Sequence, residues 1–194
     1  MSSHPSTNVL LIRHAESRPD PALPESEWPL SERGQLQAHA LAQPLATQGI
    51  EVLYSSPYRR AIDTVQPFAV AAGLQVRTDA CLRERRLTHG FHPDWKRLIE
   101  KAWDDLRFAL PGCESGLDCQ ARIRECLDGL VLKNPGRKIA IATHGNAIAL
   151  YLNSLDKTFG FQGWASLKTP DVFSVDYPSV GDPKWDGAFR MDGV

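Results

Sequence analysis

The chain has 194 residues, which is enough for one domain with a full hydrophobic core and short for two. Its formal net charge of −1 excludes a bulk attraction to nucleic acid or anionic membranes, so any affinity for phosphate must be local. No apolar run approaches the roughly 20 residues of a membrane span, and the first residues lack the pattern of a secretory signal. We therefore expect a cytoplasmic protein that binds neither nucleic acid nor membrane.

The first predicted element is a short apolar strand over residues 9–12 that ends directly in Arg13 and His14. A short apolar run between polar residues is typical of a strand buried on both faces of a sheet. Ligands of open α/β sheets bind just beyond the carboxyl ends of such strands. A guanidinium and an imidazole at this point suit an anion, and the imidazole could serve as a nucleophile.

Helical and extended patterns then alternate up to residue 78, with helix caps and glycine stops at the boundaries. The expected elements are a helix over 31–48, a strand over 51–55, a helix that starts at Ser56-Pro57 and stops at Gly73, and a strand over 74–78.

The second half contains an insertion and then another strand that ends in a histidine. Residues 139–143 are apolar and lead directly into His144 and Gly145. The other expected elements are a helical insertion over about 84–112 with a helix over 94–110, a helix from a capping box at Ser115, a helix ending at Leu155, edge strands over 164–167 and 172–176, and an irregular tail over 178–194.

This alternation predicts a single α/β domain over residues 1–194. We expect a three-layer sandwich, with a mainly parallel central sheet and helices on both faces. The small helical insertion would cover the site at the strand ends. No coiled-coil seam is present, and the sequence indicates no oligomeric state.

The four cysteines show no C-x-x-C spacing, which argues against a zinc site or a thioredoxin-like motif. Cys119 and Cys126 are seven residues apart on one face of a predicted helix, and we expect all four cysteines to be buried reduced thiols. His89 and His92 have a spacing that could chelate a metal, but no third ligand is near them in the sequence.

Six short segments carry recognisable motifs: residues 11–17, 30–38, 55–64, 82–84, 112–115 and 143–145. They include an Arg-His pair, a Ser-Pro-x-x-Arg-Ala element and a second histidine. In this order they resemble the motifs of the histidine phosphatase superfamily, which includes the cofactor-dependent phosphoglycerate mutases, and the resemblance extends from about residue 8 to 176.

The resemblance implies a phosphoryl transfer through a phosphohistidine on His14, with Glu84 as the proton donor and no metal or other cofactor. The phosphate-binding residues would be Arg13, Arg60, His144 and Gly145. Residue chemistry agrees, because arginine binds phosphate oxygens in bidentate fashion and nearby cations favour the neutral, nucleophilic form of histidine.

Simpler interpretations exist for several of these residues. Arg59 competes with Arg60 for the phosphate role, although the motif favours Arg60, and Glu84 could belong to a surface ion cluster with its arginine neighbours. Glu16 and Glu114 are expected to be structural.

The chain also departs from the family pattern at three positions. Ala15 and Cys113 replace glycines, and Asp20 stands where many relatives have a phosphate-binding asparagine. Ala15 fits only if its φ is negative, which we assume. A carboxylate would repel a phosphate dianion, so Asp20 is not assigned to the site.

These features predict a metal-independent phosphomonoesterase that acts on a small phosphorylated metabolite. The alternatives are a 2,3-bisphosphoglycerate-dependent phosphoglycerate mutase, a protein phosphohistidine phosphatase, and an inactive binding module that keeps the fold. The resemblance implies that mutases of the family are longer chains with a larger insertion, and the insertion here is short by comparison. Specificity would depend on the insertion, with Arg86, His92 and Trp95 as the main candidates and Arg85 and His89 beside them.

Overall fold

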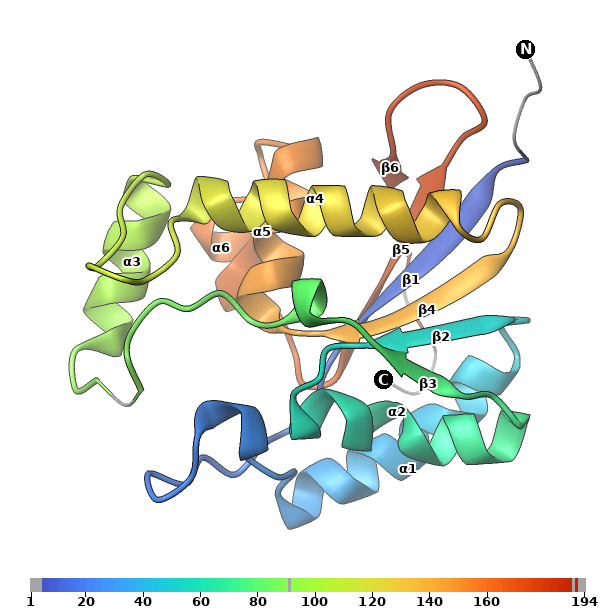
Figure 1. Cartoon of the computed structure of the whole chain (residues 1–194), viewed down its shortest axis with the longest axis horizontal. Coiled ribbons are helices and arrows are strands. Elements are labelled where there is room, and N and C mark those ends of the chain that lie inside the picture. The colour runs from blue at the N-terminus through green and yellow to red at the C-terminus, as the bar shows by residue number, and fades with distance from the viewer. Residues whose placement is uncertain (1–4, 91, 190, 192–194) are drawn as a thin grey trace.

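The computed structural model describes residues 5–90, 92–189 and 191, and Figure 1 shows a twisted sheet between two layers of helices. The initial residues 1–4, on which part of the signal-peptide argument depends, lie outside the described residues, as do residues 192–194 of the predicted tail. The expected α/β sandwich is confirmed.

The sheet has six described strands in the order β3-β2-β4-β1-β5-β6. Strands β1, β4, β2 and β3 are parallel neighbours, whereas β5 runs antiparallel to both β1 and β6. The register pairs Arg13 of β1 with Thr143 of β4, so the two strands end side by side. The strands are β1 (Thr7–Arg13), β2 (Val52–Ser55), β3 (Val76–Thr78), β4 (Lys138–Thr143), β5 (Asp171–Tyr177) and β6 (Lys184–Trp185).

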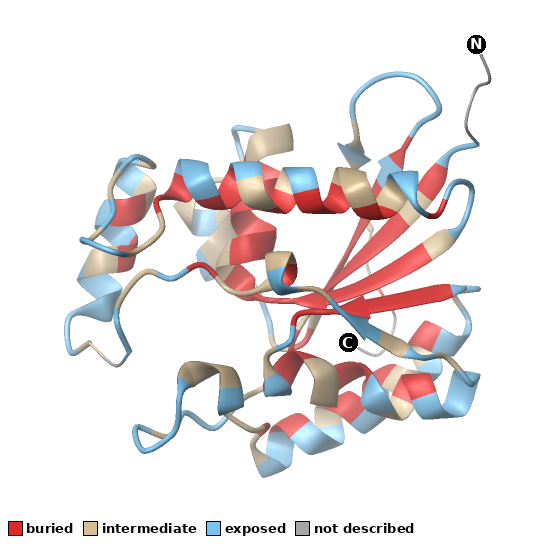
Figure 2. Ribbon diagram, in the orientation of Figure 1, coloured by how far each residue is buried: buried red, intermediate tan, exposed pale blue. Residues whose placement is uncertain are grey.

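Alternate residues of the central strands belong to two separate cores, and Figure 2 shows buried residues in these strands and in the helices on both sides of the sheet. Leu10 and Ile12 pack with α1 and α2, while Val9 and Leu11 pack with α4 and α5. The helices are η1 (Glu25–Glu27), α1 (Glu32–Ala46), α2 (Arg59–Ala72), η2 (Ala80–Leu82), α3 (Trp95–Asp104), α4 (Gly116–Leu132), α5 (Gly145–Leu155) and α6 (Phe161–Ala165), the η elements being 3-10 helices.

Local capping chemistry explains several helix boundaries that the sequence predicts. The Ser31 hydroxyl accepts a hydrogen bond from the Gly34 N–H at the start of α1, and Ser115 accepts one from Asp118 at the start of α4. Gly73 ends α2 with a φ of 64°, a left-handed conformation that glycine adopts without strain.

Some predicted elements are wrong in position or type. The second helix begins at Arg59 rather than Ser56, because the Ser56 N–H is still engaged in the sheet with the Ala142 carbonyl. Residues 161–165 form helix α6 where a strand over 164–167 was expected, and β5 is interior rather than at an edge. The predicted insertion helix is shorter, and the tail is not wholly irregular, since β6 pairs with β5.

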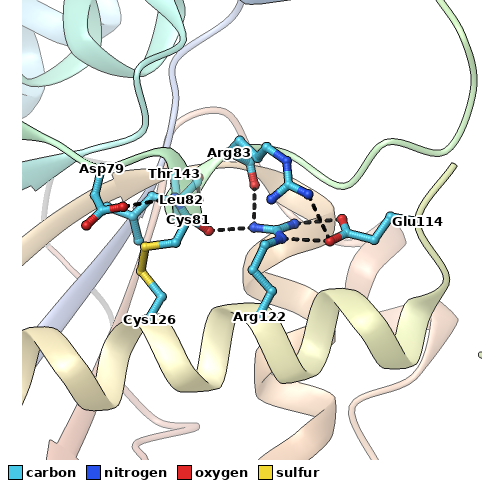
Figure 3. Close-up of a disulfide and its surroundings, with 8 residues drawn as sticks. All are labelled: Asp79, Cys81, Leu82, Arg83, Glu114, Arg122, Cys126 and Thr143. Carbon is cyan, nitrogen blue, oxygen red and sulfur yellow. Dashed lines mark hydrogen bonds and ion pairs between the residues drawn. A yellow bond between two sulfur atoms is a disulfide. The ribbon is translucent and has the colours of Figure 1, made fainter. Parts of the chain in front are cut away.

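The expectation of four reduced thiols is also wrong, because Cys81 and Cys126 form a disulfide (Figure 3). Their Cα atoms are 5.9 Å apart, within the usual range for a disulfide, and they join η2 to α4. The spacing of cysteines indicates only which of them share a face of one helix. It carries no signal for a contact between two elements that are far apart in the sequence. Cys113 and Cys119 remain free.

Within the described part of the chain, no helix is both long enough and apolar enough to cross a membrane.

Candidate active site

The parallel pairing of β1 and β4 brings the two predicted histidines together at the carboxyl edge of the sheet. The His14 N–H donates to the Thr143 carbonyl over 3.1 Å, which extends the pairing by one residue. The two imidazole rings lie edge to face, with their centroids 5.2 Å apart. His144 is fully buried, and His14 is only 9% exposed.

The hydrogen bonds of His14 leave one ring nitrogen suited to attack. Nδ1 lies 2.7 Å from the Ala15 carbonyl, an acceptor, so we assign the ring proton to Nδ1. Nε2 then carries the lone pair and accepts a hydrogen bond from Arg60 Nε over 3.1 Å. The ring is therefore held in one tautomer with Nε2 facing the arginine.

Both histidines are neutral at physiological pH. Burial, followed by the positive charge of Arg60, lowers the pKa of His14 to about 3. The pKa of His144 is lowered well below its ordinary value, again mainly by burial and then by Arg60. A neutral His14 keeps its nucleophilic lone pair throughout the range in which an ordinary histidine titrates.

Arg13 reaches the same edge from the end of β1 and is fixed by the chain that follows α6. Its Nη1 donates to the carbonyls of Leu167 and Lys168 over 2.8 and 3.0 Å. A Cβ atom at Gly145 would come within 3.1 Å of Arg13 Nε, so glycine gives the guanidinium room beside the start of α5. Within the described residues, Arg13 Nε and His144 Nδ1 are buried without a hydrogen-bond partner, as suits donors for an anion.

The structure places Arg60, and not Arg59, against His14. Arg60 is 3% exposed and binds Glu25 of η1 through the backbone carbonyl and the carboxylate, over 2.7 and 2.8 Å. Arg59 points to solvent, with a side chain that is 55% exposed and an ion pair to Asp63 one helical turn away. The motif therefore selects the arginine that contacts His14.

Ala15 fits beside His14 because no described residue other than glycine has a positive φ. Its N–H donates to the Thr64 hydroxyl over 2.9 Å, and its methyl group is buried in a small cluster with Leu30 and Ala38. The assumption of a negative φ is confirmed. The extra methyl group packs into the protein and does not displace the histidine.

Glu84 lies at the N-terminus of α5, the helix that begins directly after His144. Its carboxylate accepts hydrogen bonds from the backbone N–H groups of Asn146 and Ala147 over 3.2 and 3.0 Å. Burial raises the pKa of Glu84, and this effect outweighs the N–H groups of Arg85 and Asn146, which favour the charged form. Glu84 therefore does not belong to a surface ion cluster, because its carboxylate is bound by the start of α5.

Among the described residues, the predicted specificity residues form no hydrogen bond, ion pair or ring contact with His14. Arg86 is exposed, and His92 caps a backbone turn by accepting the Asp94 N–H. Trp95 is 43% exposed and meets Trp164 of α6 edge to face, with 6.4 Å between the ring centroids. Trp164 lies a few residues before Leu167 and Lys168, whose carbonyls hold Arg13.

Two further insertion residues have structural roles where pocket lining was expected. Arg85 is buried and donates to the carbonyls of Phe108 and Glu114, which ties the end of the insertion to the segment that contains Glu84. His89 bonds to the Pro111 carbonyl.

The three acidic residues that the sequence analysis left out of the site form contacts that hold loops and helices in place. Glu16 accepts a hydrogen bond from the Ser31 hydroxyl, and Glu114 binds Arg122 and Arg83. Asp20 accepts from the Ala22 N–H within its own loop.

The described residues contain one group of side chains with the geometry of metal ligands, namely Asp79, Cys81 and Cys126. The two sulfur atoms are bonded to each other, so they provide no thiolate for a metal.

Several residues that shape the site were missed from the sequence. The Ser56 hydroxyl lies 2.8 Å from His144 Nε2, and Glu25 pairs with Arg60. Ser56 belongs to the Ser-Pro motif and could have been found from it. Glu25 comes from an irregular loop and has no local signal, because its partner is 35 residues away.

Comparisons with known proteins agree with this geometry. The family model of the histidine phosphatase superfamily (branch 1) matches residues 9–176. The chain belongs to this superfamily. Proteins named as probable phosphoglycerate mutase GpmB from Yersinia enterocolitica and Yersinia pestis are 30% and 31% identical to it in matches of length 160, and the matches cover 76% of this chain and 74% of theirs.

Solved structures of the superfamily share nearly the whole fold. A mycobacterial glucosyl-3-phosphoglycerate phosphatase with VO3 has a TM-score of 0.76 and 27% identity, covering 92% of this chain and 96% of its own. A phosphoserine phosphatase from Entamoeba histolytica with 3-phosphoglyceric acid has a TM-score of 0.77 at 20% identity, covering 96% and 98% of the two chains, which supports the fold alone. The chain thus shares the fold of these proteins over most of its length. It is an enzyme of the histidine phosphatase superfamily, and its relatives include proteins named as phosphatases and as probable mutases.

Proposed function

We propose that this chain is a metal-independent phosphomonoesterase that hydrolyses a small phosphorylated metabolite through a phosphohistidine on His14. The observation that carries this proposal is the state of His14, which is buried and neutral with Nε2 directed at Arg60. An uncharged imidazole that keeps the lone pair of Nε2, beside a guanidinium that can bind phosphate, is the arrangement that a nucleophilic attack on phosphorus requires.

In the first half of the reaction, Nε2 of His14 attacks phosphorus and the bond from phosphorus to the ester oxygen breaks. Arg13, Arg60, His144 and the N–H groups at the start of α5 hold the phosphoryl oxygens, and the Arg60 Nε–H turns from Nε2 to one of them. Glu84 gives its proton to the departing alkoxide. The products are the free alcohol and phosphohistidine.

In the second half, water attacks the phosphohistidine and Glu84 takes up a proton from it. The bond between phosphorus and Nε2 breaks, so inorganic phosphate leaves and neutral His14 is restored. The raised pKa of Glu84 favours this double role, because its proton is retained to a higher pH than an ordinary glutamate would allow. Activity that depends on protonated Glu84 is lost as the pH rises through the pKa of this residue.

The substrate is expected to be small and anionic. Trp95 and Arg86 belong to the insertion next to the site, where a ring and a second acidic group of the substrate would be recognised. The name of one structural relative refers to glucosyl-3-phosphoglycerate, which is a small phosphate monoester. A cytoplasmic location stays a prediction, and the Cys81–Cys126 disulfide is more typical of an oxidising compartment.

A phosphoglycerate mutase is the second candidate, and its support is the identity of 30–31% to proteins named as probable mutases. A mutase would use the same phosphohistidine and return the phosphoryl group to another hydroxyl. The insertion of this chain favours the phosphatase, because α3 is the single helix described in it.

The decisive experiment measures phosphate release from p-nitrophenyl phosphate and from glycerol phosphates by the wild type and His14→Ala, with and without EDTA. We expect EDTA to have no effect and His14→Ala to lose at least about 10⁴-fold in kcat, the scale seen when a catalytic nucleophile is removed. His39→Ala is the matched control, since His39 is exposed on α1, and it should retain wild-type activity.

Interconversion of 2- and 3-phosphoglycerate, stimulated by 2,3-bisphosphoglycerate and faster than phosphate release, would establish the mutase instead. A protein that forms no phosphohistidine with any of a broad panel of phosphate esters would be a binding module, and the proposal would be wrong.

A further inference from the structure

The general acid lies on a segment with no regular structure of its own. Between the end of η2 at Leu82 and residue 90, the described backbone is neither helix nor strand. A carboxylate that must reach the leaving oxygen needs placement to within a fraction of an ångström. The position of Glu84 therefore has to come from contacts with other parts of the fold.

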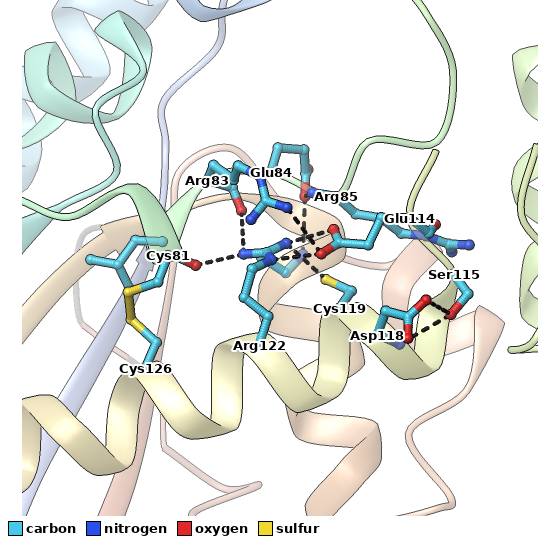
Figure 4. A network of polar contacts seen from close by, with 12 residues as sticks. Cys81, Arg83, Glu84, Arg85, Glu114, Ser115, Asp118, Cys119, Arg122 and Cys126 are labelled. Atoms are coloured by element: carbon cyan, nitrogen blue, oxygen red, sulfur yellow. Dashed lines mark hydrogen bonds and ion pairs between the residues drawn. A yellow bond between two sulfur atoms is a disulfide. The ribbon is translucent and has the colours of Figure 1, made fainter. Parts of the chain in front are cut away.

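Arg122 of α4 provides such contacts, and Figure 4 shows its guanidinium between the segment and Glu114. Nε and Nη2 bind the two carboxylate oxygens of Glu114 over 2.6 and 2.7 Å. Nη1 donates to the carbonyls of Cys81 and Arg83, and Nη2 also donates to Cys119 Sγ. All five N–H groups of the guanidinium have an acceptor, and the side chain is 15% exposed.

The contact with Arg83 is the important one, because the carbonyl of Arg83 belongs to the peptide bond that leads into Glu84. Arg122 therefore holds the backbone immediately before the acid, over 3.1 Å. Arg122 also holds the carbonyl of Cys81. A second link joins Cys81 to α4, because Cys81 forms a disulfide with Cys126, which lies one helical turn beyond Arg122. The carboxylate end of Glu84 is held separately by the N–H groups of α5.

We propose that Arg122 is a positioning residue for the general acid: it holds the peptide bond before Glu84 so that the carboxyl group meets the leaving oxygen. This inference rests on the role given to Glu84 in the proposed function. Arginine suits the task because its planar fork binds a carboxylate in bidentate fashion and still has a nitrogen for the carbonyls. A lysine has three donors on one atom and cannot make these contacts together.

The test compares leaving groups in single-turnover formation of the phosphohistidine. An aliphatic alkoxide needs a proton as it departs, whereas p-nitrophenolate leaves without one, so only the first depends on a well-placed acid. For Arg122→Ala we expect phosphohistidine formation from glycerol phosphate to slow by about 10²-fold, at the lower end of the range for general acid catalysis. Formation from p-nitrophenyl phosphate should change by less than about threefold.

Arg124→Ala is the matched control, because Arg124 lies on the same helix in an exposed ion pair with Asp182. It should leave both rates unchanged. Glu84→Gln supplies the second comparison: if Arg122 acts through Glu84, adding Arg122→Ala to Glu84→Gln should slow the glycerol phosphate reaction no further. Arg122→Lys, which keeps the charge, should show an intermediate loss and serves if Arg122→Ala does not fold.

A measurement without turnover separates this inference from the proposed function. The pKa of the Glu84 carboxyl group, followed by carbon-detected NMR, should fall toward its ordinary value in Arg122→Lys, because a carboxyl group that is no longer held in its buried position is hydrated while the positive charge nearby is kept. It should stay unchanged in Arg124→Ala. An unchanged pKa in Arg122→Lys overturns the inference, whether or not the wild type proves to be a phosphatase. An equal slowing with both leaving groups, or a further slowing in the Glu84→Gln background, also overturns it.

Discussion

The two halves of the candidate site are held in place by different parts of the fold. In the phosphate half, His14 and His144 directly follow paired parallel strands, and Arg60 comes from the first turn of a helix. In the acid half, Glu84 lies on an irregular segment that is fixed by Arg122, by a disulfide and by the N-terminus of α5. The first half is built from backbone pairing and the second from side-chain contacts.

This difference has a physical consequence for mutations. Strand pairing fixes the phosphate half through many backbone hydrogen bonds, so a change there should act directly on phosphate binding. It should then affect all phosphate esters alike. Changes in the contacts of the acid half should act through the placement of one carboxyl group, and their effect should depend on the leaving group.

Among the variants that test this division of the site, the largest effect is expected for Arg60→Lys. The variant keeps a positive charge but loses the fork that contacts both His14 and Glu25 and that would bind two phosphoryl oxygens. We expect kcat/KM to fall by about 10²- to 10³-fold, the cost of removing a donor to transition-state charge. Steady-state assays should show the same factor for p-nitrophenyl phosphate and for glycerol phosphate.

Arg59→Lys is the control for this comparison, since Arg59 is the exposed neighbour paired with Asp63, and it should change kcat/KM by less than about twofold. A loss for Arg60→Lys that differs strongly between the two substrates would show that the two halves of the site are not separable.

The same division explains which parts of the site could be predicted from the sequence. Residues 9–14 and 139–145 carry their own signal, because an apolar strand that runs into a histidine specifies both the element and where its side chain emerges. The fold class follows from the alternation of such segments with helices. Glycine stops and capping residues also predicted the boundaries of α1 and α4, where the contacts are local.

The acid half could be predicted only through the resemblance to a family. Arg122 and Cys126 meet the Glu84 segment across about 40 residues of chain, and no local pattern records such a contact. The start of α2 was misplaced for the same reason, since Ser56 belongs to the sheet and to His144 and does not cap the helix. Long-range side-chain contacts decided these positions.

A smaller effect is expected for Gly145→Ala, which tests how tightly the phosphate half is packed. The new Cβ would lie within 3.1 Å of Arg13 Nε, so the guanidinium must move by a few tenths of an ångström. We expect kcat/KM to fall by about tenfold, because small displacements of a charge-binding group lower the rate steeply. The fall should again be equal for the two substrates.

Gly129→Ala is the matched control, because Gly129 lies within α4 and a Cβ there meets no atom within 4 Å. It should leave activity unchanged and stabilise the protein by up to about 1 kcal/mol in urea denaturation, as expected for alanine in a helix. Unchanged activity in Gly145→Ala would mean that Arg13 does not need its present position.

The smallest effect on activity is expected when the disulfide is removed in Cys81→Ser/Cys126→Ser. The bond closes a loop with a sequence separation of 45, so its loss should lower the free energy of unfolding by about 2–4 kcal/mol. Arg122 still holds Cys81 and Arg83 by their carbonyls, and phosphohistidine formation from glycerol phosphate should slow only about threefold to fivefold, with p-nitrophenyl phosphate unaffected.

Cys113→Ser, which removes a free thiol, controls for the loss of a cysteine and should leave stability and both rates unchanged. If disulfide removal slowed phosphohistidine formation equally from both substrates, the bond would also support the phosphate half. The two halves of the site would then not be held independently.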